Sequence, residues 1–387
     1  MIPYGKQDIN AEDIEAVLNV LQSEFLTQGP QIPHFENSIK KAVKAQYAIA
    51  VNSATSALHI ACLALGVGKG DVVWTTPISF VASANCALYC GASIDFVDID
   101  ADTYNLSVFH LQKKLQHARL NHLSLPKVVI PVHLCGQSCA MQEIYQLSQE
   151  YDFSIIEDAS HSIGGRYLDR SIGGCQYSDI SIFSFHPVKI VTTAEGGVAT
   201  TNNASLAQKM TLLRSHGITR DPLLMSTTKE GDCYYEQVCL GFNYRMTEMQ
   251  AALGVSQMRR LASFVTLRNK LAKRYDHALQ DLPVQLPQQM QGTYSSRHLY
   301  IIRLQLDKIQ ITQKEVFSLL REKGIGVNLH YIPIHLQPYY QRLGFLSGQF
   351  PHAESYYKNA LSLPLYHGMT KAQQDVVIVT LKEVLLS

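Results

Sequence analysis

Short apolar runs recur along the first half of the chain, separated by longer segments in which apolar residues have helical spacing. Such runs, rich in Val and Ile and bounded by Gly, Pro, Asn or Asp, are typical of buried strands. The strands predicted in this way are Ala48–Val51, Asp71–Thr75, Ser93–Val97, Lys127–Val132, Phe153–Ile156 and Asp179–Phe185. Because helical segments lie between most of them, we expect an α/β fold with a mostly parallel, doubly wound sheet.

The two ends of the chain follow different patterns. An amphipathic helix is predicted over Ala11–Leu21, starting near Asn10, and one long helix over Thr247–Leu271. After it, Leu299–Arg303 reads as a strand of a smaller α+β domain. A chain of 387 residues exceeds a typical domain of roughly 100 to 200 residues. We therefore predict a large domain over residues 1–255 and a small C-terminal domain over residues 256–387.

Composition narrows the functional classes. The net charge of +1 and pI near 7.6 give no electrostatic footprint for nucleic acid. No apolar run approaches the roughly 18 residues that a membrane span needs, and the first residues lack the pattern of a signal peptide. The eight cysteines form no C-x-x-C pair, which argues against structural zinc. We expect a cytoplasmic protein with free thiols, without metal, nucleic-acid or membrane binding.

Lys189 is the first candidate catalytic residue. It lies in the segment Phe183–Lys189, just after the predicted strand Asp179–Phe185 and before a Gly-containing turn. A lysine amine attacks carbonyl groups only after losing its proton, and partial burial beside a strand end favours that loss. An ordinary surface lysine would be the preferred interpretation if this residue stood alone.

A second element supports the catalytic interpretation. The predicted strand Phe153–Ile156 leads into Glu157, Asp158 and, three residues later, His161. Open parallel sheets bind ligands at the carboxyl ends of their strands. A carboxylate that holds a protonated pyridine nitrogen and a lysine that holds a carbonyl are the two groups that pyridoxal phosphate chemistry requires. Taken singly, Asp158 could cap a helix and His161 could be an ordinary buried histidine.

A candidate phosphate site follows the strand near Tyr47–Val51. The residues Asn52–His59 combine small hydroxyl side chains with the start of a predicted helix. Helix N-termini bind anions through free N–H groups and the positive end of the helix dipole. Ser53 or Thr55 could equally be a simple helix cap, and capping is compatible with phosphate binding.

These segments resemble the sugar-nucleotide aminotransferases of the DegT/DnrJ/EryC1/StrS family, which are fold-type I pyridoxal phosphate enzymes. The resemblance covers nearly the whole chain. It implies a large cofactor-binding domain, a smaller C-terminal domain and pyridoxal 5'-phosphate as the cofactor. The segments that carry it are Phe25–Pro30, Asn52–Leu58, Thr75–Ala82, Glu157–Gly164, Phe183–Gly197, Gly241–Met246 and Leu329–Tyr331.

The resemblance also implies a role for each matching residue. Lys189 would hold the cofactor carbonyl as a Schiff base and later move the proton, while Asp158 would hold the ring nitrogen. His161 would lie near the phenolic oxygen, and Phe80 would stack on the ring unless it is a core residue. The residues expected to bind the phosphate are Ala54, Thr55, Ser56, Ser184 and, from a neighbouring subunit, Asn243. That last contact implies a homodimer with shared active sites.

Two stretches of the sequence are similar to one particular group of members within the family. Thr75–Ala82 and Phe183–Lys189 are most similar to members that act in pseudaminic acid biosynthesis, a route to cell-surface polysaccharide and flagellin glycosylation. This implies transfer of an amino group from L-glutamate to C4 of a UDP-4-keto-6-deoxy-N-acetylhexosamine, giving UDP-4-amino-4,6-dideoxy-N-acetyl-β-L-altrosamine. The implied substrate contacts, each also a candidate for ordinary packing, are Tyr4, Phe25, Leu26, Thr27, His330 and Tyr331.

Three alternatives remain open. A UDP-4-keto-pentose aminotransferase shares the Ser-Phe-His-x-x-Lys pattern. A related pyridoxal-dependent sugar dehydratase carries histidine in place of the lysine, so Lys189 argues against it. A cofactor-free regulatory protein of the same fold is disfavoured by the joint presence of Asp158, Lys189 and the hydroxyl cluster.

Overall fold

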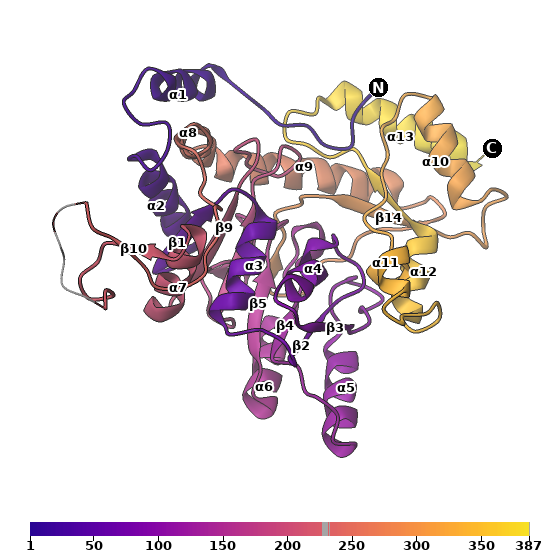
Figure 1. Cartoon of the computed structure of the whole chain (residues 1–387). Coiled ribbons are helices and arrows are strands. Elements are labelled where there is room, and N and C mark those ends of the chain that lie inside the picture. Colours follow the sequence, from indigo (N-terminus) through magenta and orange to yellow (C-terminus); the bar gives the residue numbers. More distant parts are fainter. Residues whose placement is uncertain (227–230, 232, 387) are drawn as a thin grey trace.

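The computed structural model describes residues 1–226, 231 and 233–386. In this part of the chain a seven-stranded sheet has the order β1-β9-β8-β5-β4-β2-β3 (Figure 1). Its strands are β1 (Tyr47–Val51), β2 (Val72–Thr75), β3 (Ser93–Phe96), β4 (Val128–Ile130), β5 (Ser154–Asp158), β8 (Ile180–Ser184) and β9 (Gly197–Thr201). Only β9 runs antiparallel to its neighbours within this sheet. The α/β fold with a mostly parallel sheet is confirmed.

The strand β9 is the element of this sheet that the pattern did not predict. It begins at Gly197 and is buried along its whole length between β1 and β8. Its sequence, Gly-Val-Ala-Thr-Thr, has neither the alternation of a half-buried strand nor the large apolar side chains of a typical central strand. The other six strands lie within two residues of their predicted bounds.

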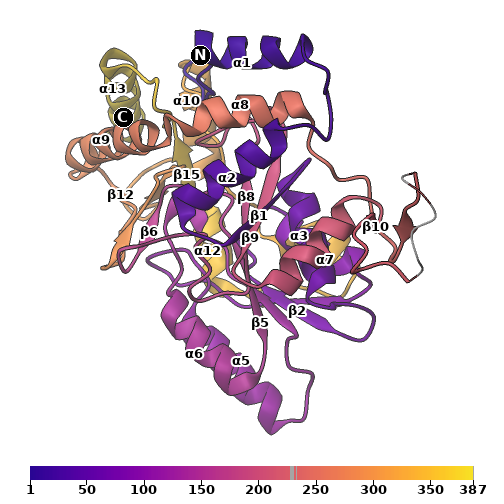
Figure 2. The same ribbon diagram turned by 90° about the vertical axis from the view of Figure 1, so that its left-hand side faces the viewer.

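Helices cover both faces of the sheet (Figure 2). One face packs against α3 (Ala54–Ala64), α4 (Ala82–Tyr89) and α7 (Ala204–Arg214). The other packs against α2 (Gln31–Val43) and α8 (Glu248–Met258) at one end, and against α5 (Val108–Leu120) and α6 (Met141–Tyr151) at the other.

Alternation along β5 determines where its acidic pair points. Ile156 belongs to the core under α3 and α4, whereas Ile155 belongs to the core under α5 and α6. Because side chains alternate along a strand, Asp158 faces the first layer and Glu157 the second.

The helix α1 (Ala11–Leu21) agrees with its prediction, but the predicted continuous helix Thr247–Leu271 is wrong. Two helices, α8 (Glu248–Met258) and α9 (Leu261–Leu279), replace it. The break occurs at Arg260, whose guanidinium nitrogens lie 2.5 Å from the carboxylates of Asp8 and Asp13 in the N-terminal segment. This tertiary contact is invisible to local periodicity.

A second hydrophobic core lies towards the C-terminus. The sheet β12 (Val284–Gln285), β14 (Tyr300–Leu304) and β15 (Ala360–Leu363) packs with α9, α10 (Gln313–Glu322) and α13 (Lys371–Leu386). The strand predicted at Leu299–Arg303 is thus found as β14. Helix α9 contributes Phe264 to the core between the seven-stranded sheet and α2 and α8, and it contributes Tyr275 to this second core. The boundary proposed at residue 255 remains a prediction.

Short elements connect these layers. The N-terminal segment joins the second core, because Ile2 pairs with Ile325 beside α10 (Figure 1). The remaining elements are η1 (Leu134–Gly136), β6 (Arg166–Tyr167), β7 (Arg170–Ser171), β10 (Ile218–Thr219), β11 (Glu236–Gln237), β13 (Thr293–Tyr294), η2 (Ile334–Leu336), α11 (Pro338–Gln341) and α12 (Pro351–Asn359).

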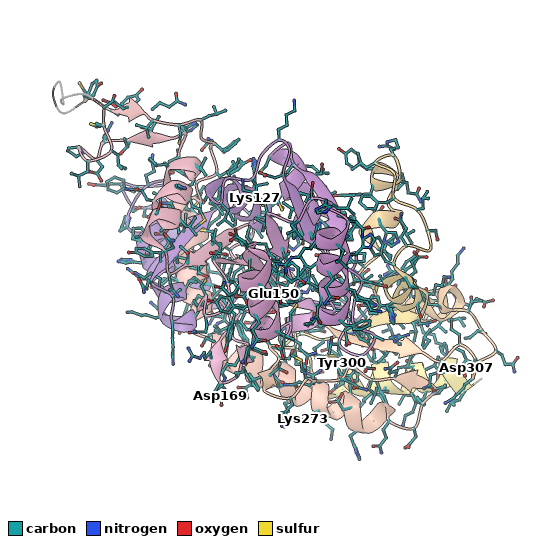
Figure 3. All side chains as sticks on the ribbon, turned by 90° about the horizontal axis from the view of Figure 1, so that it is seen from below. Lys127, Glu150, Asp169, Lys273, Tyr300 and Asp307 are labelled. Atoms are coloured by element: carbon teal, nitrogen blue, oxygen red, sulfur yellow. The ribbon has the colours of Figure 1, made fainter. Side chains whose placement is uncertain are left out.

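Figure 3 views the side of the molecule on which Lys127, just before β4, and Glu150, near the end of α6, lie. The Lys127 ammonium pairs with Asp71 at 2.9 Å, and Arg119 pairs with Glu150 at 3.5 Å. These side chains are partly exposed, so each pair contributes about 0 to 1 kcal/mol to stability. The functional candidates gather at the opposite, carboxyl ends of the strands.

Within the described ranges, no helix is both long and apolar enough to cross a bilayer. Those residues also contain no group of three His, Cys, Asp or Glu side chains placed to hold a metal ion. The eight cysteines are free thiols.

Candidate active site

The carboxyl end of β5 places Asp158 against the start of α4. The carboxylate is buried; its Oδ2 accepts a hydrogen bond of 2.6 Å from the Ser83 hydroxyl, and its Oδ1 accepts one of 3.2 Å from the Ser160 N–H. An ionised carboxylate has about four acceptor positions, so both oxygens retain capacity for a further donor. Asp158 can therefore hold a protonated ring nitrogen.

Lys189 lies in the turn that follows β8. Its backbone N–H donates to the carbonyl of His186 at 2.9 Å, and its side chain is half-buried. Burial lowers the pKa of the Lys189 amine to about 8, although the negative charge of Asp158 acts in the opposite direction. Among the described residues the amine has no hydrogen-bonding partner. An unpaired amine that loses its proton near neutral pH suits attack on a carbonyl and proton transfer.

His161 and Tyr331 form the next part of the site. The Tyr331 hydroxyl lies 3.1 Å from Nε2 of His161, and the two rings are nearly parallel. Burial lowers the pKa of His161 well below its usual value, and the nearby positive charge of Lys189 adds to this. The ring is therefore neutral at physiological pH. Its Nδ1 is buried without a partner among the described residues, so a polar group of a bound ligand would satisfy it.

His330 completes this group next to Tyr331. Its Nδ1 lies 2.8 Å from the Ser362 hydroxyl, and its ring centroid lies 5.2 Å from that of Tyr4. Burial, with the charge of Lys189 as the smaller cause, lowers the pKa of His330 to about 3. Neutral imidazoles and tyrosine hydroxyls can donate and accept hydrogen bonds, as recognition of sugar hydroxyls requires.

The start of α3 has the form of an anion site. Ser53 caps the helix by accepting from the Ser56 N–H at 3.1 Å, and the Ser56 hydroxyl donates to Oδ1 of Asn52 at 2.7 Å. The cap uses Ser56, so its predicted phosphate contact remains a prediction. Ala54 and Thr55 belong to the first turn, where backbone N–H groups have no intrahelical acceptor and face outward.

Ser184 joins these N–H groups through β9. Ser184 ends β8 and pairs with Gly197 on β9. A Cβ atom built on Gly197 would lie 2.3 Å from the Ser53 carbonyl oxygen and 2.5 Å from the Ala54 nitrogen. Glycine therefore lets β9 approach the helix N-terminus, and Ser184 lies on the neighbouring strand, paired with this glycine. The residues present fit the phosphate, ring nitrogen and carbonyl of pyridoxal phosphate.

Phe80 is not a core residue. Its side chain is 60% exposed, although it follows a buried strand, and its ring centroid lies 6.4 Å from that of Tyr331. The alternative that Phe80 only fills the interior is wrong. An exposed aromatic ring beside the candidate site is available to cover a flat ligand.

The predicted substrate contacts separate into two groups. Tyr4, His330 and Tyr331 lie with the central residues. In contrast, Leu26 accepts a hydrogen bond from the Glu248 N–H, Thr27 pairs with Thr247, and Phe25 is 50% exposed. The turn formed by Phe25, Leu26 and Thr27 is thus held at the start of α8, and no contact with Lys189 or Asp158 is found among the described residues.

Asn243 lies outside the central group as well. Its side chain is exposed, and its backbone pairs with Ser215. The neighbouring Tyr244 carbonyl accepts a hydrogen bond of 2.8 Å from Asn52, just before the cap of α3. An exposed amide beside the phosphate-binding helix can reach a second molecule.

Pattern analysis missed two residues of this site. His298 packs on His161 with ring centroids 4.4 Å apart, and Ser83 donates to Asp158. Ser83 directly follows the segment Thr75–Ala82, and His298 precedes the predicted strand Leu299–Arg303, but no local pattern marks either residue, so only the tertiary structure brings them to the site. His298 is in turn held by Arg268, whose Nη1 donates to the His298 carbonyl at 3.1 Å.

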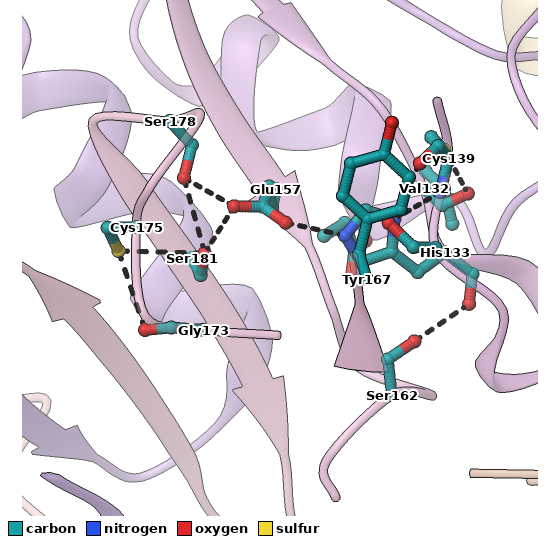
Figure 4. Close-up of polar contacts among 12 residues, drawn as sticks. Val132, His133, Cys139, Glu157, Ser162, Tyr167, Gly173, Cys175, Ser178 and Ser181 are labelled. Atoms are coloured by element: carbon teal, nitrogen blue, oxygen red, sulfur yellow. Dashed lines mark hydrogen bonds and ion pairs between the residues drawn. The ribbon is translucent and has the colours of Figure 1, made fainter. Parts of the chain in front are cut away.

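Glu157 has a different role on the opposite face of β5 (Figure 4). Nδ1 of His133 accepts from the Cys139 N–H, so Nε2 carries the hydrogen and donates to Glu157 at 2.7 Å. The hydroxyls of Ser178 and Ser181 donate to the same carboxylate. A cavity of about 20 Å³ beside this group has room for about one water molecule.

Comparison with known proteins gives a family match over nearly the whole chain. The model of the DegT/DnrJ/EryC1/StrS aminotransferase family matches residues 7–382. The UDP-4-amino-4,6-dideoxy-N-acetyl-beta-L-altrosamine transaminase of Campylobacter jejuni serotype O:23/36 is 36% identical over 392 residues, covering 100% of this chain and 98% of the relative. The spore coat polysaccharide biosynthesis protein SpsC of Bacillus subtilis is 36% identical over 386 residues, covering 99% and 97%.

A solved structure supports the same grouping. The Helicobacter pylori aminotransferase PseC, involved in the biosynthesis of pseudaminic acid, superposes with a TM-score of 0.91 at 31% sequence identity. The alignment covers 100% of this chain and 99% of the other. Similarity therefore extends over both hydrophobic cores and the site between Asp158 and Lys189.

Proposed function

We propose that this chain, which belongs to the DegT/DnrJ/EryC1/StrS aminotransferase family, transfers an amino group from L-glutamate to C4 of a UDP-4-keto-6-deoxy-N-acetylhexosamine. The product would be UDP-4-amino-4,6-dideoxy-N-acetyl-β-L-altrosamine, on the route to pseudaminic acid. Family membership establishes the coarser function: the protein is a pyridoxal phosphate-dependent sugar aminotransferase. The expected enzyme class and cofactor are thus confirmed.

The observation that carries the proposal is that three different chemical groups lie at one edge of the sheet. Lys189 supplies an amine, Asp158 a carboxylate, and Ala54 with Thr55 an anion-binding helix N-terminus. Bound pyridoxal phosphate supplies a ring that withdraws electrons from the carbon whose proton is removed. Asp158 would keep the ring nitrogen protonated, and the α3 N-terminus with Ser184 would hold the phosphate.

Proton transfer falls to Lys189. With a pKa near 8, its amine exchanges a proton at physiological pH more readily than a lysine with an ordinary pKa. The neutral rings of His161 and His330 leave Lys189 as the titrating base among these three residues. One base can serve both halves of a ping-pong reaction, first with the amino donor and then with the ketone.

Sugar recognition is assigned to Tyr4, His330 and Tyr331. Two hydroxyls and one imidazole lie on the side of Lys189, and each can bind sugar hydroxyl or carbonyl groups. Phe80 is exposed beside Tyr331 and would exclude water from the reacting atoms. The Campylobacter relative, similar over its whole length, supports the choice of UDP-linked 4-keto-6-deoxy-N-acetylhexosamine.

A substrate panel tests this choice. The purified enzyme is incubated with L-glutamate and, separately, a UDP-4-keto-6-deoxy-N-acetylhexosamine or a UDP-4-keto-pentose, and the amino sugar and 2-oxoglutarate are quantified by mass spectrometry. We expect a higher kcat/KM for the hexosamine. Preference for the pentose would overturn the pseudaminic acid assignment and leave the aminotransferase assignment intact. The equal identity to SpsC keeps other 4-keto sugar nucleotides as the alternative substrates.

We also propose a cytoplasmic homodimer with shared active sites. The exposed position of Asn243 beside Asn52 and the α3 cap supports a contact from one subunit to the phosphate bound by the other. The free state of all eight cysteines suits a reducing compartment.

Mixing two inactive chains tests the shared site. In a dimer of one Lys189→Ala chain and one Asn243→Asp chain, one site would have an intact Lys189 and an intact partner Asn243. Random exchange of subunits makes half of the dimers mixed, so we expect about a quarter of wild-type activity in the mixture. The Asn243→Asp charge repels phosphate and keeps the background low. If the mixture is no more active than the separate variants, each site is built by one chain.

A further inference from the structure

A buried chain of two serine hydroxyls ends at Asp158. The Ser79 and Ser83 hydroxyl oxygens lie 2.7 Å apart, and the Ser83 hydroxyl lies 2.6 Å from Oδ2 of Asp158. Their exposed fractions are 3% for Ser79, 0% for Ser83 and 5% for Asp158. Solvent therefore has little access to this group, and each short contact is made within the protein.

The direction of these hydrogen bonds follows from the charge of Asp158. An ionised carboxylate can only accept, so the single hydroxyl hydrogen of Ser83 points to Asp158. Ser83 has no second hydrogen to give to Ser79, and Ser79 must therefore donate to the Ser83 oxygen. Both hydroxyl dipoles point towards the carboxylate, and hydrogen bonds aligned in this way strengthen one another.

The segment that carries both serines is fixed from the C-terminal part of the chain. The Pro77 carbonyl accepts a hydrogen bond of 2.8 Å from the Ile334 N–H, and the Tyr340 hydroxyl donates to Oδ1 of Asn85 at 2.6 Å. Between these anchors the Ser83 N–H donates to the Phe80 carbonyl at 3.2 Å. The hydroxyl of Ser83 is thus held at a defined place relative to β5.

We propose that Ser83, supported by Ser79, is a positioning residue for the reaction. It holds Oδ2 of Asp158, so that the carboxylate keeps one orientation and its charge remains directed at the ring nitrogen of the bound cofactor. Ser83 does not touch the substrate and acts through Asp158. The inference depends on the cofactor and not on the sugar substrate of the proposed function.

The physical reason is that Asp158 would lose a hydrogen-bond donor if the Ser83 hydroxyl were removed. Without the Ser83 hydroxyl, Oδ2 would lose the one hydrogen-bond donor that it has among the described residues, at a site that is only 5% exposed to solvent. A buried carboxylate oxygen without a donor is costly, and the carboxylate would rotate towards other donors such as the Ser160 N–H. Asp158 would then hold the proton of the ring nitrogen less well.

The experiment uses full-length enzyme loaded with pyridoxal phosphate that carries ¹⁵N in the ring. The ¹⁵N chemical shift reports directly whether the ring nitrogen is protonated, and it needs no sugar substrate. Ser83→Ala is compared with wild type and with Ser148→Ala. Ser148 is also buried and loses a hydroxyl bond, here to the Tyr145 carbonyl, but it lies in α6 away from the site.

We expect the Ser83→Ala resonance to move towards that of the unprotonated ring over the pH range in which wild type stays protonated. Loss of a hydrogen bond to a charged group corresponds to about a tenfold effect or more, so kcat should fall about tenfold while KM changes less than about twofold. Ser148→Ala should match wild type in both measurements. Ser83→Thr, which retains the hydroxyl, should restore the wild-type resonance.

An unchanged ¹⁵N shift and unchanged kcat in Ser83→Ala would overturn the proposal. If Ser83→Ala does not fold, Ser79→Ala decides, because it leaves the Ser83–Asp158 bond in place but removes its support. A shift of the Ser79→Ala resonance in the same direction supports the proposed role of the chain from Ser79 through Ser83 to Asp158, and a wild-type resonance overturns it. If the wild-type enzyme has a protonated ring nitrogen by its ¹⁵N shift but does not aminate the UDP-4-keto-6-deoxy-N-acetylhexosamine, the result counts against the proposed substrate and not against the role of Ser83.

Discussion

Replacing Lys189 with alanine is expected to abolish covalent attachment of pyridoxal phosphate and to lower turnover at least about 10³-fold. A positioned general base contributes 10² to 10⁴-fold to rate, and Lys189 also provides the carbonyl-binding amine. Cofactor binding should persist through the α3 N-terminus and Asp158. Reduction with borohydride followed by peptide mass spectrometry should find the cofactor on Lys189 in wild type and on no residue in the variant.

The melting temperature of the Lys189→Ala variant shows whether its loss of turnover comes from the missing amine or from misfolding. Burial lowers the pKa of Lys189 from 10.5 unfolded to about 8 folded, so the folded state disfavours the charged amine. That cost is present below about pH 8 and disappears as the pH rises through the folded pKa towards the unfolded one. The apo Lys189→Ala protein should therefore melt at or above the wild-type Tm at pH 7.

A matched control is Lys273→Ala, which removes an exposed lysine from α9 (Figure 3). It should keep full activity and the borohydride label. Normal turnover in Lys189→Ala would show that another residue performs proton transfer, and the assignment of the catalytic base would be wrong.

Asp158→Asn is expected to lower kcat about 10² to 10³-fold while the cofactor remains bound, the range measured when a preorganised electrostatic group is removed. Asparagine is similar in size and can still accept from Ser83. It lacks the negative charge that keeps the ring nitrogen protonated, so the ring becomes a weaker electron sink. Stopped-flow absorbance of the half-reaction with the amino donor measures the loss directly.

The pKa of Lys189 in the Asp158→Asn variant reports the effect of the Asp158 charge separately from the shape of its side chain. The charge of Asp158 raises the pKa of Lys189 against the larger effect of burial. In Asp158→Asn this support is gone, so the pKa of Lys189 should fall below about 8, measured from the pH dependence of cofactor capture by the apo enzyme. Asp95→Asn on β3, which breaks a partly exposed ion pair with Lys114 on α5, is the control and should change neither quantity. An Asp158→Asn enzyme with wild-type kcat would refute the role of the carboxylate.

The sequence was sufficient for six strands of the seven-stranded sheet and for the placement of Asp158 and Lys189 at or just after strand ends. Parallel strands separated by helices place their carboxyl ends along one edge of the sheet, so the sequence alone predicts that Asp158 and Lys189 share one site. The helix start at Ala54 could be read in the same way, because anion binding at a helix N-terminus depends on local backbone geometry.

Contacts between distant segments required the tertiary structure. The strand β9 has no local signature because burial on both faces removes alternation, and the helix break near Arg260 depends on carboxylates about 250 residues away in the chain. Asp158 meets Ser83, and His161 meets His298 and Tyr331, across separations that no periodicity encodes. Local patterns reflect the backbone geometry and burial of one segment at a time. Side-chain partners depend on how segments pack, and only the folded chain determined them.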